Sequence, residues 1–121
     1  ATNQSFEVTR FFNLSYQSFT IEAWVFLFSI SGDNPVLSQC QCATCAGQCL
    51  SVLIRSGRLF MTFTLNDLSG STSLSANTWT HVAFVYDSAA SQQILYVNGV
   101  QDGIKSSAAA YQGRNGSIRI G

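Results

Sequence analysis

Apolar and polar residues alternate with a period of two along most of the chain. In residues 4–14 the even positions are mostly apolar, as at Phe6 and Phe12, and the odd positions are mostly polar. Residues 18–28 alternate in the same way at first, but from Trp24 onward they are apolar on both faces. Alternation predicts half-buried β-strands. A strand that is apolar on both faces is expected to be central and covered on both sides.

Turn signals divide the rest of the chain into further short strands. Asn98-Gly99 is a residue pair that a type I′ hairpin turn prefers, Ser56–Arg58 predicts a tight reversal, and Ser31–Pro35 is a cluster of turn-forming residues. No convincing amphipathic helix interrupts the pattern. About nine strands are expected, in residues 4–14, 18–28, 36–39, 50–55, 59–65, 77–87, both arms of 92–103, and 117–121. This pattern predicts an all-β fold, an antiparallel two-sheet β-sandwich formed by one domain of residues 1–121.

Four blocks of sequence, in order, carry a resemblance to a known family. They are "FTIEAWV" (residues 19–25), "WTHVAFVYD" (79–87), "LYVNGV" (95–100) and "IRIG" (118–121). The chain resembles the laminin G-like branch of the concanavalin A-like lectin/glucanase superfamily. The resemblance implies a jelly roll of two curved antiparallel sheets. Members of that branch usually continue past the "IRIG" strand, so we expect a jelly roll that lacks its last strand or strands.

An open jelly roll would expose apolar core and unpaired backbone groups at a sheet edge. The amphipathic residues 1–14 can fill such a gap in a neighbouring subunit by strand exchange, which produces a homo-oligomer or a fibre. Our main hypothesis is therefore a non-catalytic, extracellular structural subunit that assembles by strand complementation. The alternative is a carbohydrate- or ligand-binding module, a lectin or adhesion domain, of a larger extracellular protein, with glycans as partners.

The charge of the chain argues against two classes of partner. Only 10% of the residues are charged, and the formal net charge is zero. The six basic residues are scattered, so we expect no nucleic-acid partner. The longest apolar run, residues 24–30, is far shorter than the roughly 18 residues that cross a bilayer, so we expect no membrane insertion.

The acidic residues give no sign of catalysis. No two of the six acids stand two positions apart on one strand, as a glucanase carboxylate set would require. We expect Glu22 to be a structural carboxylate between the sheets and His81, the only histidine, to be structural as well. Asp33, Asn34 and Asp87 have no spacing that favours a calcium site. We predict that the protein is not an enzyme, with no catalytic residues, no metal and no cofactor.

All four cysteines lie within ten residues, at Cys40, Cys42, Cys45 and Cys49. We favour two disulfides at the tip of a hairpin, because cross-strand partners in a hairpin have a nearly constant sum of positions. This rule favours the nested pairs Cys40–Cys49 and Cys42–Cys45 over the crossed pairing. A soft-metal site and a redox C-x-x-C remain as alternatives.

The remaining candidate sites lie on the expected surface. Asn3, Asn13 and Asn115 each begin a glycosylation sequon, which together with clustered cysteines favours an extracellular protein. Tyr16 and Tyr111 are candidate aromatic platforms for a ligand. We expect the other large aromatics of the strands, Trp24 and Trp79, to belong to the core.

Overall fold

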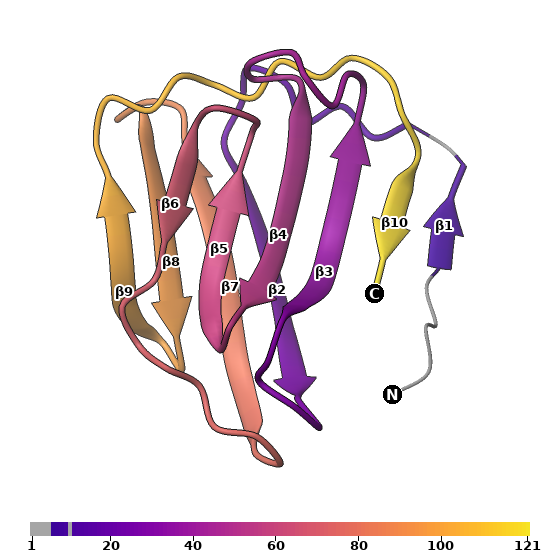
Figure 1. The fold of residues 1–121 in the computed structure, drawn as a ribbon. Helices are drawn as coiled ribbons and strands as arrows, with labels where there is room; N and C mark the ends of the chain where they lie inside the picture. The colour runs from indigo at the N-terminus through magenta and orange to yellow at the C-terminus, as the bar shows by residue number, and fades with distance from the viewer. Residues whose placement is uncertain (1–5, 10) are drawn as a thin grey trace.

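The computed structural model describes residues 6–9 and 11–121, which form ten strands in two facing antiparallel sheets (Figure 1). A six-stranded sheet has the order β1-β10-β3-β4-β5-β6, and a four-stranded sheet behind it in the figure has the order β2-β7-β8-β9. The predicted all-β, antiparallel two-sheet sandwich is confirmed. The strands are β1 (Phe6–Val8), β2 (Phe19–Phe26), β3 (Asp33–Cys40), β4 (Cys49–Arg55), β5 (Arg58–Thr62), β6 (Asp67–Ser69), β7 (Trp79–Asp87), β8 (Gln92–Val97), β9 (Val100–Lys105) and β10 (Ile118–Ile120).

The core lies between the sheets, where alternate residues of each strand point inward. Strand β4 contributes Val52 and Ile54, both fully buried, and β7 contributes Val82 and Phe84. Burying apolar surface in this way contributes roughly 25 cal/mol per Å² to stability. The fully buried apolar side chains also include Leu50, Leu59, Met61, Phe63, Leu95 and Tyr111.

Strand β2 was predicted to be a central strand covered on both sides, and this prediction was wrong. It is an edge strand of the four-stranded sheet, since among the described residues only β7 pairs with it. Trp24 and Trp79 point outward from β2 and β7 on the face away from the other sheet and are 65% and 64% exposed, so their predicted place in the core was wrong. A strand can be apolar on both faces although only its inner face is covered, because the described part of the chain forms no third layer over the outer face.

The N-terminal strand ends earlier than predicted and pairs within its own chain. Strand β1 pairs with β10, with Phe6 opposite Ile120 and Val8 opposite Ile118. It ends at Val8 rather than at residue 14 as predicted, and Phe6 is 77% exposed. The pairing therefore buries little apolar surface. Exchange of residues 1–14 between subunits stays a prediction.

Two of the predicted turns are confirmed, and a third was missed. Asn98 and Gly99 have φ values of 49° and 78°, and Ser56 and Gly57 have 50° and 82°, as tight turns between antiparallel strands require. Residues 59–65 were predicted as one strand, which was wrong at its end. Residues 64 and 65 have φ values of 66° and 57°, and they reverse the chain from β5 into β6 without a glycine.

The cysteines close the loop between β3 and β4. Disulfides join Cys40 to Cys49 and Cys42 to Cys45, which is the nested pairing that the sequence favours. Cys40 and Cys49 are also partners in the β3–β4 register. Across residues 6–9 and 11–121, no cluster of three or more potential ligand side chains could hold a metal. No helix of the described chain is long and apolar enough to cross a membrane.

Candidate ligand-binding site

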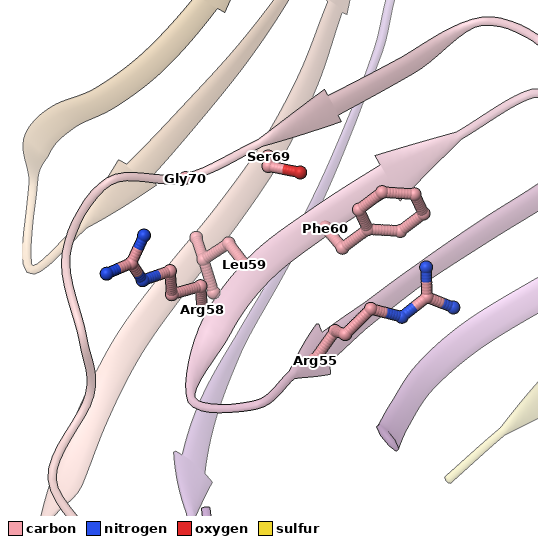
Figure 2. Close-up of a pocket in the computed structure, with 6 residues that line it drawn as sticks. All are labelled: Arg55, Arg58, Leu59, Phe60, Ser69 and Gly70. Atoms are coloured by element: carbon pink, nitrogen blue, oxygen red, sulfur yellow. The ribbon is translucent and has the colours of Figure 1, made fainter. Parts of the chain in front are cut away.

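A pocket of about 360 Å³ opens on the outer side of the six-stranded sheet, where β4, β5 and β6 meet (Figure 2). Its volume is in the range of small-molecule sites. It is lined by Arg55, Arg58, Leu59, Phe60, Ser69 and Gly70.

Strand register brings these side chains together. The two-residue turn after β4 places Arg55 directly opposite Arg58, and the β5–β6 pairing places Phe60 opposite Ser69. Because successive side chains of a strand alternate between its faces, Arg58 and Phe60 share the outer face while Leu59 is fully buried beneath them.

Gly70 continues the wall of the pocket after β6. Its amide donates to the carbonyl oxygen of Leu59 at 2.8 Å, which extends the pairing beyond the strand. A Cβ at this position would lie 2.1 Å from Oδ2 of Asp102. The close approach of a carboxylate therefore requires a residue without a side chain here.

The two arginines of the pocket differ in their electrostatic surroundings. Arg55 donates to both carboxylate oxygens of Asp33, at 2.9 and 3.1 Å. This hydrogen-bonded pair lowers the pKa of Asp33 and raises the pKa of Arg55. The Arg55 guanidinium also lies 4.3 Å from the centroid of the Phe60 ring. Arg58 is exposed and forms no ion pair with the residues that the structure describes.

The arrangement offers several groups that can bind a ligand. An aromatic ring offers a stacking surface, the guanidinium groups are hydrogen-bond donors in a fixed plane, and the Ser69 hydroxyl can donate or accept. Sequence reasoning missed this site because it searched for exposed tyrosines and tryptophans. The available signal was "RSGRLF" (residues 55–60), in which arginines flank a turn next to a phenylalanine.

Tyr16, one of the two predicted platforms, is accessible. Its side chain is 57% exposed, and the Arg114 guanidinium lies 5.8 Å from the centroid of its ring. Its backbone amide donates to the carbonyl oxygen of Tyr111 at 2.9 Å. Tyr16 is not one of the residues that line the pocket.

Tyr111, the other predicted platform, is fully buried. Its hydroxyl lies 2.9 Å from Oε1 of Gln39, and burial raises the pKa of Tyr111 to about 12. A ring without accessible surface cannot serve as the exposed platform that the sequence predicted. The physical reason is that the segment before β10 turns this side chain inward against Phe63, with ring centroids 5.6 Å apart.

Glu22 and His81 are neighbours on the outer face of the four-stranded sheet. Oε1 of Glu22 lies 3.5 Å from Nε2 of His81, and the Glu22 side chain is 64% exposed. The prediction that Glu22 lies between the sheets was therefore wrong, because β2 turns this position outward together with Trp24. The His81 ring packs against Trp24, with centroids 5.2 Å apart.

The sequons fall in exposed parts of the chain where the structure describes them. Asn13 and Asn115 are both exposed. Oδ1 of Asn13 accepts hydrogen bonds from the Ser15 hydroxyl and amide, at 2.6 and 3.1 Å. Asn3 lies outside the described residues. Glycosylation of these asparagines stays a prediction.

Comparison with known proteins places the chain in a family. All of its residues, 1–121, match the sequence profile of the concanavalin A-like lectin/glucanase superfamily. The chain belongs to this superfamily. No match is found among curated protein sequences.

Solved structures show the same fold at low sequence identity. The chain is similar to domains LG4-5 of the mouse laminin α1 chain, with 16% identity, a TM-score of 0.69, and coverage of 97% of this chain and 31% of that one. It is also similar to the CBM40 of a Ruminococcus gnavus IT-sialidase bound to α2,3-sialyllactose, with 17% identity, a TM-score of 0.68, and coverage of 87% and 63%. A third is domain 4 of AbnA, a GH43 extracellular arabinanase from Geobacillus stearothermophilus, in complex with arabinotriose, with 17% identity, a TM-score of 0.65, and coverage of 88% and 52%. The chain thus spans less than two thirds of the length of each of these structures.

Proposed function

We propose that this superfamily member is a non-catalytic carbohydrate-binding module that works outside the cell, and that Phe60 is the centre of its binding site. The observation that carries the proposal is the pocket in which the Phe60 ring lies beside the Arg55 guanidinium, with Arg58 and the Ser69 hydroxyl also lining it. The fold supports it, because two similar structures hold sugars, α2,3-sialyllactose in one and arabinotriose in the other. The two disulfides support an oxidising, extracellular setting.

The pocket matches the two kinds of surface that a sugar ring presents. The apolar C–H face of a pyranose can stack on the Phe60 ring, while its hydroxyls meet the donors of Arg58 and Ser69 around the rim. The Arg55 guanidinium, itself held by Asp33, fixes one side of the ring. Such a preorganised site loses less conformational entropy on binding than a flexible one.

Glycan-array binding followed by calorimetry tests the proposed function. Phe60→Ala should weaken binding at least about tenfold, as for a central aromatic contact. Phe28→Ala is the matched control, because Phe28 is 73% exposed and lies outside the pocket. Binding that survives Phe60→Ala but is lost in Tyr16→Ala would move the site to the Tyr16 surface. The absence of binding to any glycan would refute the function.

Self-association by strand exchange is a second candidate function, and the outer face of β2 favours it. Trp24 and Phe28 are 65% and 73% exposed on or just after this edge strand, and the exposed Trp79 of β7 lies opposite Phe26. Exposed apolar surface beside an unpaired sheet edge commonly marks an interaction site. The expected partner is a second copy of the chain, which would add residues 1–14 as a strand beside β2.

Light scattering of the purified chain over a dilution series tests this assembly. The chain should form oligomers that persist on dilution, and Trp24→Lys should convert them to monomers. Val100→Lys is the control, since Val100 is 69% exposed on β9, at the opposite edge of the same sheet. A stable monomer at every concentration would rule the assembly out.

A further inference from the structure

We infer, building on the proposed glycan-binding function, that the pocket selects sugars that carry an anionic group, a carboxylate or a sulfate, and that Arg58 binds this group. The inference begins from the placement of two like charges. Arg55 and Arg58 are direct cross-strand partners at the end of the β4–β5 hairpin. Like charges in this arrangement destabilise a sheet.

Only one of the two charges is offset within the described chain. Asp33 is the cross-strand partner of Arg55 on its other side, and both of its carboxylate oxygens accept from that guanidinium. Arg58 has no corresponding acid among the described residues. Figure 2 shows the Arg58 side chain directed away from Phe60 and Arg55, toward the segment that follows Gly70. An anionic ligand at Arg58 would provide an ion pair like the one that Asp33 forms with Arg55.

Two further acids stand near the pocket, but neither forms an ion pair with Arg58. Asp67 lies two positions before Ser69 on β6. It accepts a hydrogen bond from the hydroxyl of Thr62, its partner in the β5–β6 register. Asp102 lies behind Gly70 and is 7% exposed; its Oδ1 accepts from the amide of Thr72 at 2.9 Å, while its buried Oδ2 has no hydrogen-bond partner among the described residues. Neither carboxylate lines the pocket, so neither blocks an anion at Arg58.

The geometry of a guanidinium explains the selectivity. Its planar fork forms two parallel hydrogen bonds with a carboxylate or a sulfate, and these charge-assisted bonds are roughly twice as strong as neutral ones. A neutral sugar hydroxyl offers only one acceptor in that direction. The Phe60 ring would then hold the sugar ring while Arg58 reads its charge.

The test compares matched glycans on the intact chain, first on an array and then by calorimetry. Each acidic glycan is paired with its neutral counterpart, such as 3′-sialyllactose with lactose, oligogalacturonate with oligogalactose, and 3′-sulfolactose with lactose. Binding of the acidic member should be at least about tenfold tighter, and added salt should weaken it. Comparing the sialyl and galacturonate pairs, which carry carboxylates, with the sulfated pair shows whether the pocket prefers a carboxylate or a sulfate.

Arginine variants assign the preference to this pocket. Arg58→Gln should remove the acidic preference while leaving the weaker neutral binding, and Arg58→Lys should restore only part of it because a lysine lacks the fork. Arg114→Gln is the control, since Arg114 is exposed and lies beside Tyr16. Loss of the preference in Arg114→Gln but not in Arg58→Gln would overturn the assignment.

The inference and the proposed function fail in different ways. If acidic and neutral members bind equally, and Phe60→Ala still abolishes binding, the acidic selectivity is wrong and the glycan-binding function stands. If no glycan on the array binds, acidic or neutral, the function itself falls and the inference falls with it.

Discussion

The hydroxyl of Tyr111 lies 2.9 Å from Oε1 of Gln39, and both residues are buried, with exposures of 0% and 1%. Gln39 in turn donates from Nε2 to the carbonyl oxygen of Phe12 at 2.9 Å. The contact therefore joins three distant segments, namely the loop before β2, strand β3 and the segment before β10. Buried polar groups are nearly always paired. Here the pairing holds the segment before β2 and the segment before β10 against strand β3.

Removing this hydroxyl should destabilise the protein. Tyr111→Phe keeps the ring and its packing but leaves Oε1 of Gln39 without its partner, so the free energy of unfolding should fall by about 1–3 kcal/mol. Urea unfolding followed by fluorescence measures the change. Tyr16→Phe is the control, because Tyr16 is 57% exposed and its stability should change little. Equal stability of both variants would contradict the role given to the buried hydroxyl.

The same tyrosine should make stability depend on alkaline pH. Burial raises the pKa of Tyr111 to about 12, above its ordinary value of 10. Above pH 10 the unfolded chain loses this proton while the folded chain retains it, so the stability present below pH 10 is lost as the pH rises toward 12. The loss should be on the order of 2 kcal/mol.

Urea midpoints between pH 8 and pH 12 measure this dependence. The pKa of Tyr86 is also raised by burial, so it adds a loss in the same direction. Tyr111→Phe should therefore show a shallower fall with pH than the parent chain. If the two curves fall in parallel, Tyr111 does not contribute.

Gly70 provides a test of the pocket wall. A Cβ there would lie 2.1 Å from Oδ2 of Asp102 and 3.4 Å from Cβ of Leu59. Gly70→Ala should therefore displace the Asp102 carboxylate or the loop, and it should lower the free energy of unfolding by about 1–3 kcal/mol. Ser75→Ala, at an exposed position in the same loop, is the control. A Gly70→Ala chain as stable as the parent would show that the wall yields without cost.

Strands and turns were predictable because their signals are local. The alternation of residues 19–25 and the Asn98-Gly99 pair depend only on neighbours in sequence, and both predictions agree with the structure. The reversal at residues 64 and 65 was not predictable in this way, because its positive φ values fall on a threonine and a leucine. These residue types rarely signal a turn.

Burial of the aromatics was not predictable because it depends on topology. Tyr111 was expected at the surface and is buried, whereas Trp24 and Trp79 were expected in the core and are exposed. Side-chain chemistry is similar in the three cases, and what differs is the placement in the fold: the two tryptophans lie on the uncovered outer face of β2 and β7, whereas the segment before β10 turns Tyr111 into the core. The candidate pocket has the same origin, since Phe60 and Ser69 meet only through the β5–β6 register.

The two disulfides should stabilise the protein through the loops that they close. Cys40 and Cys49 are nine positions apart in the sequence, and Cys42 and Cys45 are three positions apart. In the loop-entropy account, replacing the first pair by serine should cost about 2–3 kcal/mol and replacing the second about 2 kcal/mol. Urea unfolding of the two double variants, Cys40→Ser with Cys49→Ser and Cys42→Ser with Cys45→Ser, measures both costs.

Reduction should loosen the tip of the β3–β4 hairpin while the sandwich stays folded. The tip also has backbone bonds to other segments, from the Gly47 amide to Thr64 at 3.0 Å and from the Gln112 amide to Gly47 at 2.7 Å. After reduction, hydrogen exchange should therefore increase at residues 41–46 and much less in β4 and β7, whose core positions are independent of the bridges. Cooperative unfolding on reduction would show instead that the bridges hold the whole domain.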